Sequence, residues 1–391
     1  MDQPVDFDLI DLDRLRGLGS LKWSMYPNTI GAFVAEMDFG TAPAVTEALR
    51  GAVDAGLFGY LPSSVSDSMS EACADWHRRG YGWDLATEQI HPIADVVKGY
   101  ELAIEHFSRP GTAVILPTPA YMPFLMVPPL MDREIIQLPL LHTGAGWAMD
   151  LDGLDAAFAA GGHLLVLCNP YNPVGKVFSR DELTAIASVV SRNGGRVFSD
   201  EIHAPMIYPG RRHVPYALVS AETAAHTVTA TSASKAFNLP GLKCAQLIVS
   251  NDADAEVWEK IGFFASHGAS TLGVVANTAA YRAGRPWLDG ILGYLDGSRA
   301  LLGDLLAEHL PEVRYEPPEG TYIGWLDCRA LDLAPTPADF FREHAGVALT
   351  DGAACGEAGV GHVRMIFGTP RPILEQAVAS MGRAVRDHHG T

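Results

Sequence analysis

The chain contains 391 residues, 48% of them hydrophobic, which is long enough for two domains of ordinary size with substantial cores. Lys and Arg number 28 against 46 Asp and Glu, so the formal net charge is −18, and no run of basic residues interrupts this pattern. We therefore expect neither nucleic acid nor an anionic membrane as a partner.

The first residues and the cysteines indicate the compartment. The opening stretch MDQPVDFDLIDLDRLRG is acidic where a signal peptide is basic, and no apolar run approaches the roughly 18 residues of a membrane span. The five cysteines are scattered and form no C-x-x-C pair, which predicts reduced, mostly buried thiols. The histidines form no H-E-x-x-H pattern, so no metal is predicted. We expect a cytoplasmic protein.

Along the chain, short apolar runs alternate with amphipathic stretches, a rhythm that predicts α/β layers. Helices are predicted over 97–107 and over 180–192, the second with Ser179 as N-cap and Glu182 three residues later. Short apolar or β-branched runs that end at Pro, Asp, Ser or Asn predict strands buried on both faces. These runs cover 113–116, 164–168, 196–199, 228–231 and 245–249.

The pattern changes after residue 280 or so. Gly284, Arg285 and Pro286 interrupt it, and an amphipathic stretch over 298–310 and a helix over 373–386 follow. We interpret 46–283 as a large domain and 284–391 as a smaller one.

Polar residues follow four of the predicted strands directly. They are T-P-A-Y ending at Tyr121, N-P-Y-N-P-V-G around Asn172, S-D-E-I-H around Asp200, and T-S-A-S-K ending at Lys235. Because ligands bind at the carboxyl ends of strands in open α/β sheets, these segments predict an active site.

The polar residues meet the requirements of pyridoxal 5'-phosphate (PLP). Lys235 can bond covalently to the cofactor, and Asp200 can keep the pyridine nitrogen protonated. Asn172 can donate to the ring oxygen, and Tyr121 offers a ring for stacking. The phosphate group would be bound by residues near the start of the first predicted helix and around Lys235, namely Val97, Lys98, Ser232, Ser234 and Lys243.

The ordered set N-P-Y-N-P-V-G, S-D-E-I-H and S-A-S-K-A-F-N-L-P-G-L-K resembles the aspartate-aminotransferase superfamily of PLP enzymes, fold type I. The pattern is most similar to the MalY/PatB-type cystathionine β-lyases. Further motifs of that group are V-A-E-M-D-F at 34–39, F-G-Y at 58–60, P-T-P-A-Y-M-P-F at 117–124 and E-G-T-Y-I-G-W-L-D at 319–327. The resemblance begins near Trp23 and continues to the C-terminus.

The resemblance implies a three-layer α/β/α large domain with a mixed, mostly parallel sheet and a smaller α+β domain, with residues 1–45 packed against the small domain. It assigns the substrate carboxylate to Arg364 and places Tyr60 across the interface of a homodimer, near the partner's cofactor and substrate. His203 stands where many aminotransferases have Tyr, which favours the lyase group. The group usually lacks a cation at the position of Lys243, so its contact with the phosphate is the weakest part of this set.

These expectations lead to a β-elimination in which Lys235 removes the α-proton of L-cystathionine or another cysteine S-conjugate, with Asp200 and Tyr121 assisting at the cofactor and Asn172 near the substrate. The products would be a thiol, pyruvate and ammonia. One alternative is an aminotransferase, which shares the chemistry up to removal of the α-proton. A second is a PLP-binding regulator without turnover, which the complete set of catalytic residues disfavours. The S-x-x-K pattern of penicillin-binding proteins also matches at Ser232, but the chain has no K-T-G motif.

Overall fold

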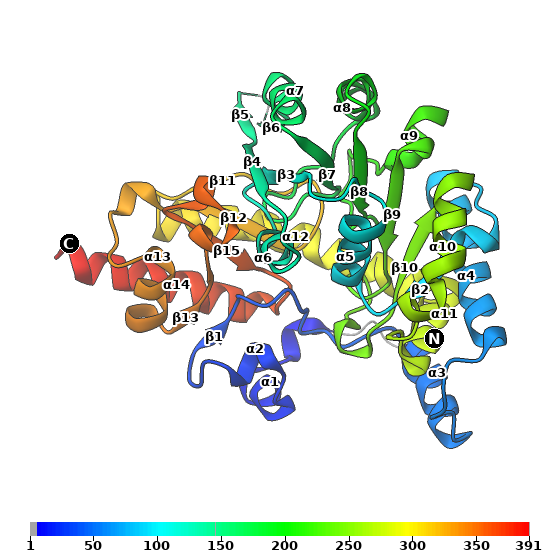
Figure 1. Cartoon of the computed structure of the whole chain (residues 1–391). Helices are drawn as coiled ribbons and strands as arrows, with labels where there is room; N and C mark the ends of the chain where they lie inside the picture. The colour runs from blue at the N-terminus through cyan, green and yellow to red at the C-terminus, as the bar shows by residue number, and fades with distance from the viewer. Residues whose placement is uncertain (1–5, 145, 391) are drawn as a thin grey trace.

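The protein, described here by a computed structural model, is resolved into defined structure over residues 6–144 and 146–390. Figure 1 shows a large domain around one central sheet and a small domain that carries the C-terminal helix. The central sheet has seven strands. Every neighbouring pair is parallel except the two pairs that involve β10 (Ala245–Val249). The order is β2 (Ile90–Ile93), β10 (Ala245–Val249), β9 (Thr227–Thr231), β8 (Arg196–Asp200), β7 (Gly162–Cys168), β3 (Ala113–Thr118) and β4 (Ile135–Pro139). The predicted mixed, mostly parallel sheet is confirmed.

All five predicted strands are present, lengthened by at most two residues at an end. The two strands that the sequence did not reveal, β2 and β4, are the edges of the sheet. Strand β2 contains Pro92, which lacks the N–H donor and is tolerated at an edge, and β4 is partly exposed. Neither has the continuous buried apolar run that identifies the inner strands.

Helices pack around this sheet (Figure 1). The predicted helix with Ser179 and Glu182 is α8, and both bonds of its capping box form, at 2.8 and 3.3 Å. The helix predicted over 97–107 is α5, which begins one residue earlier because Asp95 caps it. The elements are α3 (Pro43–Asp54), α4 (Ser63–Tyr81), α5 (Val96–His106), α6 (Met122–Leu130), α7 (Leu151–Ala159), α8 (Arg180–Arg192), α9 (Ala221–Ala225), α10 (Asp252–Ala265), α11 (Thr271–Ala283) and the hairpin β5 (Leu141–Thr143) with β6 (Gly146–Ala148).

A single long helix, α12 (Arg285–His309), leads from the large domain into the small one. The predicted interruption is confined to Gly284, which ends α11 and caps α12, because Pro286 in the first turn costs no hydrogen bond. The helix is therefore longer than the predicted stretch 298–310. No Cβ fits at Gly284, since it would overlap the Phe237 ring and the Ala280 carbonyl.

The small domain is built on an antiparallel sheet of four short strands, with α12 and α14 packed together. The division of the chain at 45/46 and 283/284 stays a prediction, and residues 1–5 of its first segment lie outside the described part. The elements are β11 (Arg314–Tyr315), β12 (Ile323–Asp327), β15 (His362–Ile366), β14 (Thr350–Asp351), α13 (Pro337–Phe340) and α14 (Arg371–His389).

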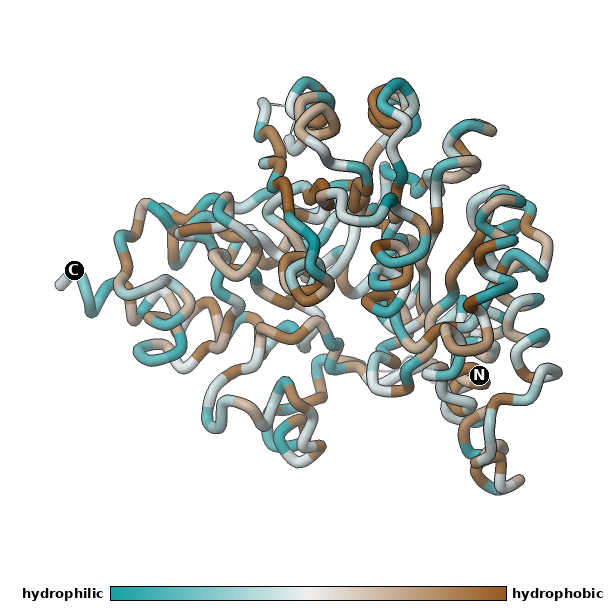
Figure 2. The backbone as a smooth tube through the Cα atoms, viewed as in Figure 1, coloured by the Kyte–Doolittle hydropathy of each residue, from teal (hydrophilic) through white to brown (hydrophobic). Residues whose placement is uncertain are grey.

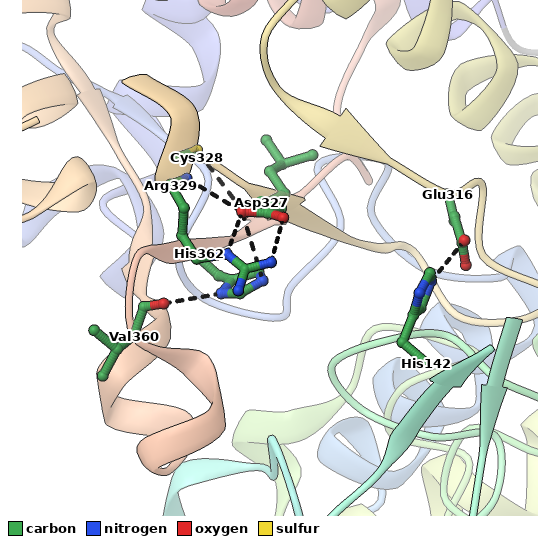
Figure 3. Close-up of polar contacts among 8 residues, drawn as sticks. His142, Glu316, Asp327, Cys328, Arg329, Val360 and His362 are labelled. Carbon is green, nitrogen blue, oxygen red and sulfur yellow. Dashed lines mark hydrogen bonds and ion pairs between the residues drawn. The ribbon is translucent and has the colours of Figure 1, made fainter. Parts of the chain in front are cut away.

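A polar cluster fixes β15 against β12, as Figure 3 shows. Asp327 accepts two hydrogen bonds from the Arg329 guanidinium, at 2.7 and 2.8 Å, and these bonds lower the pKa of its carboxyl to about 2. His362 lies between Asp327 and the Val360 carbonyl and stacks on Trp325 with a centroid distance of 5.1 Å. The same figure shows His142 of β5 paired with Glu316 at 2.7 Å, a bridge from the large domain to the residue after β11.

The N-terminal part contains two short helices that were not predicted from the sequence. Helix α1 (Leu12–Leu18) is capped by Asp11, which accepts from the Arg14 N–H at 2.8 Å, and α2 (Leu21–Ser24) follows. Strand β1 (Ile30–Gly31) then pairs in parallel with β13 (Val347–Ala348). This pairing supports the expectation that the segment packs against the small domain.

A buried ion pair anchors the segment that follows β1. Lys22 Nζ lies 2.7 Å from Asp38 Oδ2, and both residues are at most 9% exposed. Trp23 Nε1 donates to the other carboxylate oxygen at 2.8 Å, and Lys22 also donates to the Glu36 carbonyl. The segment 33–40 is thereby held in a fixed path.

Apolar residues are concentrated in the interior of both domains. In Figure 2 hydrophobic segments lie along the inner strands and hydrophilic ones mostly on outer turns. All five cysteines are buried and free, as predicted. Among the described residues, no helix combines the length and apolar character needed to cross a bilayer.

Replacing Lys22 by Met should lower the free energy of unfolding by about 3–5 kcal/mol, because it leaves the Asp38 carboxylate buried without its cation. Urea denaturation followed by circular dichroism measures this change. The control is Arg285→Met, which breaks an exposed helical pair with Asp289 and should cost about 1 kcal/mol or less. Equal losses in the two variants would contradict an anchoring contribution from the buried pair.

Candidate active site

The carboxyl end of β8 presents Asp200 in a dry environment. The residue is 4% exposed and is paired across the sheet with Cys168, the last residue of β7. Its carboxylate accepts from the Ile202 N–H at 3.1 Å and from the Cys168 thiol at 3.4 Å. Burial raises the pKa of this carboxyl to about 6. A cationic group beside it would lower this pKa and stabilise the charged form further.

Lys235 lies in the turn after β9, where its side chain is enclosed. Its Nζ donates to the carbonyl of Ala35 at 3.0 Å. Burial, followed by the positive charge of Arg364, lowers the pKa of this amine to about 8, although Glu36 and Asp200 act in the opposite direction. A larger fraction of the amine is therefore neutral near physiological pH than for a lysine in water.

Arg364, on β15 of the small domain, is 2% exposed. Its two terminal nitrogens reach the Asn172 side-chain oxygen at 3.3 Å, the Phe33 carbonyl at 2.9 Å and the Thr350 hydroxyl at 3.3 Å. Its Nε has no partner among the described residues. A buried guanidinium with an unused donor can bind a carboxylate.

His203 and Tyr121 complete the set around Lys235. His203 is 2% exposed, and its Nδ1 has no partner within the described part of the chain. Burial and the charges of Lys235 and Arg364 lower its pKa to about 3, so the ring stays neutral. Tyr121 contributes its side chain to the same cleft as Lys235 and Arg364.

The start of α5 is the predicted phosphate site, and the structure shows which of its predicted donors are already bound within the chain. The Lys98 N–H is bound to the Asp95 carboxylate at 2.8 Å, which leaves the N–H groups of Val96 and Val97 without a partner in the described chain. Lys243 is exposed, and its Nζ pairs with the other Asp95 oxygen at 2.8 Å.

The two serines before Lys235 differ in availability. The Ser232 hydroxyl donates to the Cys244 carbonyl at 2.7 Å and accepts from the Ser234 N–H at 3.0 Å. It therefore has no proton left for a phosphate oxygen. The Ser234 hydroxyl makes no hydrogen bond within the described residues, so it is the more available of the two predicted donors.

Tyr60 is the one predicted site residue that this chain does not bring near the others. It is 89% exposed and lies at a separate hollow of about 1180 Å³ that Phe263 and His267 also line. A role at the cofactor thus depends on a second chain.

Several neighbours of the site were not found from the sequence. Tyr322 donates to the same Ala35 carbonyl as Lys235, at 3.0 Å, and it lies in the motif E-G-T-Y-I-G-W-L-D that could have indicated it. Glu201, beside Asp200, accepts from buried His213 at 2.9 Å. No sequence motif indicated that Cys168 or Asp95 would contact the site residues.

The described geometry fits PLP. A cleft of about 420 Å³ contains Lys235, Tyr121 and Arg364, which come from both domains. Asp200 is a buried carboxylate that lacks a cation, and free N–H groups at the start of α5 suit a phosphate. This combination, on a mostly parallel sheet, defines the class of PLP-dependent enzymes of fold type I.

Comparisons with known proteins agree with this class. Residues 32–381 match the family model of class I and II aminotransferases. The chain is 36% identical over 371 residues to a cystathionine beta-lyase of Corynebacterium glutamicum, covering 94% of this chain and 97% of the relative. It is 33% identical to protein MalY of Escherichia coli strain K12, with 90% of each chain covered.

Solved structures give the same result. A putative PLP-dependent beta-cystathionase from Corynebacterium diphtheriae superposes with a TM-score of 0.91 at 39% identity, over 96% of this chain and 98% of that one. Cystalysin from Treponema denticola, which contains PLP, superposes with a TM-score of 0.89 at 29% identity, over 95% of this chain and 97% of that one. The chain therefore belongs to the class I and II aminotransferase family of PLP enzymes, in the branch of the cystathionine β-lyases.

The rate at which the cofactor-free protein bonds to PLP should rise with pH, with a midpoint near pH 8 and a plateau well above it, because only the neutral Lys235 amine is nucleophilic. Stopped-flow absorbance between pH 6 and pH 10 measures this rate, with Lys235→Ala as the variant in which no covalent bond forms. A midpoint near that of a free lysine would mean that burial does not lower the pKa of Lys235.

Proposed function

We propose that the enzyme cleaves the β-carbon–sulfur bond of L-cystathionine or a related L-cysteine S-conjugate. The products are a thiol, which is homocysteine when cystathionine is the substrate, with pyruvate and ammonia. The carrying observation is the cleft in which a partly buried amine of lowered pKa, Lys235, lies with a buried guanidinium, Arg364. The names of the relatives at 36% and 39% identity, a cystathionine beta-lyase and a putative beta-cystathionase, support the same reaction.

Each residue of the site has a part in this proposal. Arg364 binds the α-carboxylate and thereby orients the α-hydrogen toward Lys235. The neutral Lys235 amine takes that proton. The thiolate then leaves from the β-carbon, and the remaining three-carbon unit is hydrolysed to pyruvate and ammonia.

Further residues of this chain prepare the site. PLP, when bound, supplies an electron sink for the negative charge that develops at the α-carbon. Asp200 would keep a proton on the ring nitrogen, Tyr121 would pack against the ring, and Asn172 would donate to the ring oxygen. Ser234, the start of α5 and Lys243 would hold the phosphate. His203 supplies a neutral donor or acceptor.

Incubation of the PLP-loaded enzyme with L-cystathionine should give homocysteine and pyruvate in equal amounts. Thiol titration and a coupled pyruvate assay measure both products, and Lys235→Ala should reduce them to the background of free PLP. Transfer of the amino group to an added 2-oxoacid, without release of a thiol, would instead establish an aminotransferase.

We also propose that the active enzyme is a homodimer in which Tyr60 serves the partner's site. The support is the exposure of Tyr60, Phe263 and Phe264, at 77–89%, which is unusual for large aromatic side chains. Covering them with a second copy would remove this apolar surface from water.

The buried, free cysteines suit a reducing compartment and support a cytoplasmic location.

A mixture of a Tyr60→Phe subunit with a Lys235→Ala subunit tests the shared site. If Tyr60 acts across the interface, the heterodimer has one intact site and one site with both lesions, so its activity should reach about half that of wild type. If Tyr60 acts within its own subunit, each site has one lesion and activity stays at or below the average of the parents. Fully active protein that sediments as a monomer would refute the dimer.

A further inference from the structure

The cleft that holds Lys235 and Arg364 has a second group of charged side chains. Arg342, Asp339 and Asp351 also line it, together with Tyr26. Arg342 lies on a short π-helical turn, Phe341–Ala345, directly after α13, and Asp351 is the second residue of β14. None of these three charged residues has a part in the elimination described above.

Arg342 is held in place while part of its guanidinium stays available. Its Nη2 lies 2.7 Å from Asp339 Oδ1 and 3.4 Å from Glu343 Oε1. The guanidinium carbon lies 5.5 Å from the centre of the Tyr26 ring, a cation–π contact that fixes its plane. Nη1 and Nε make no hydrogen bond with any residue that the structure describes. The two N–H groups of Nη1 are thus free for a carboxylate.

Asp351 is a carboxylate without a cation. One oxygen accepts from the Ala353 N–H at 3.1 Å, and Asp351 forms no ion pair with a described residue. The residue before it, Thr350, contacts Arg364 at 3.3 Å. Asp351 therefore adjoins the carboxylate-binding end of the cleft and can accept from an ammonium group.

We propose that Arg342 and Asp351 form a distal subsite for a second amino-acid head on the substrate. Arg342 binds its carboxylate through the free N–H groups of Nη1, and Asp351 binds its ammonium. This inference rests on the proposed function, since it names the substrate class of the same cleft. It selects conjugates such as cystathionine, which carry an amino-acid group at each end of the thioether, over conjugates with an uncharged S-substituent.

Charge complementarity is the reason for this selection. The reacting end of the substrate occupies Lys235 and Arg364. The cleft then still contains one cation with free donors, Arg342, and one unpaired carboxylate, Asp351. A zwitterionic head satisfies both, whereas an alkyl group satisfies neither. The ion pair of Arg342 with Asp339 is only partly buried and contributes little to stability, so these contacts are better explained by binding than by folding.

The variant Arg342→Met tests the subsite with two substrates, L-cystathionine and S-ethyl-L-cysteine. We expect kcat/KM for cystathionine to fall about 10- to 100-fold, mainly through KM, because a charged hydrogen-bond partner is lost. Turnover of S-ethyl-L-cysteine should change little. The matched control is Arg285→Met, an arginine with a similar helical ion pair and a ring contact to Trp76, which lies outside this cleft and should leave both substrates unaffected.

A second variant, Asp351→Asn, keeps the acceptor for the Ala353 N–H and removes the charge. This variant should lower kcat/KM for cystathionine in the same way. Calorimetric binding to the carba analogue of cystathionine, in which a methylene replaces the sulfur, gives a readout without turnover, with L-norleucine as the ligand that lacks the distal head. Arg342→Met should weaken the binding of the carba analogue and leave the binding of L-norleucine unchanged.

The outcomes separate the two proposals. Equal losses for cystathionine and S-ethyl-L-cysteine, or none for either, would overturn the distal subsite while the lyase activity stands. Absence of thiol release from both substrates with the wild-type enzyme would refute the proposed function, and the binding comparison of the analogue with L-norleucine would still decide whether the subsite exists.

Discussion

The carbonyl oxygen of Ala35 accepts hydrogen bonds from Lys235 and from Tyr322, both at 3.0 Å. Lys235 follows a strand of the central sheet, and Tyr322 immediately precedes β12 of the small sheet. Two residues earlier, the Phe33 carbonyl accepts from Arg364. One stretch of N-terminal backbone therefore joins the candidate reacting amine to the candidate carboxylate-binding guanidinium, and the cleft has its shape only while this stretch keeps its path.

That path is fixed by contacts that lie outside the cleft. Asn238 binds the Met37 backbone twice, accepting from its N–H at 2.9 Å and donating to its carbonyl at 2.8 Å. The buried pair of Lys22 with Asp38 holds the following residue. Because these groups are desolvated, displacing the segment would leave polar atoms unpaired, which makes the position costly to change.

The sequence predicted the parts of the site that depend on local pattern. Asp200 and Lys235 were found because each ends or follows a buried apolar strand, and the capping box of α8 was visible in Ser179 and Glu182. Contacts between distant residues could not be predicted. Ala35 and Lys235 are 200 positions apart, and nothing in either neighbourhood indicates that a backbone oxygen meets the amine. The inward orientation of Ser232, toward the Cys244 carbonyl, likewise depends on the packed fold.

The junction at Gly284 has a mechanical consequence. The helix that starts there has 25 residues and spans about 37 Å at the usual rise, without an internal break. The two domains are thus connected by a stiff rod whose near end is packed so tightly that no side chain fits at the joint. The direction of this rod therefore sets where the small domain, and with it Arg364, stands relative to Lys235.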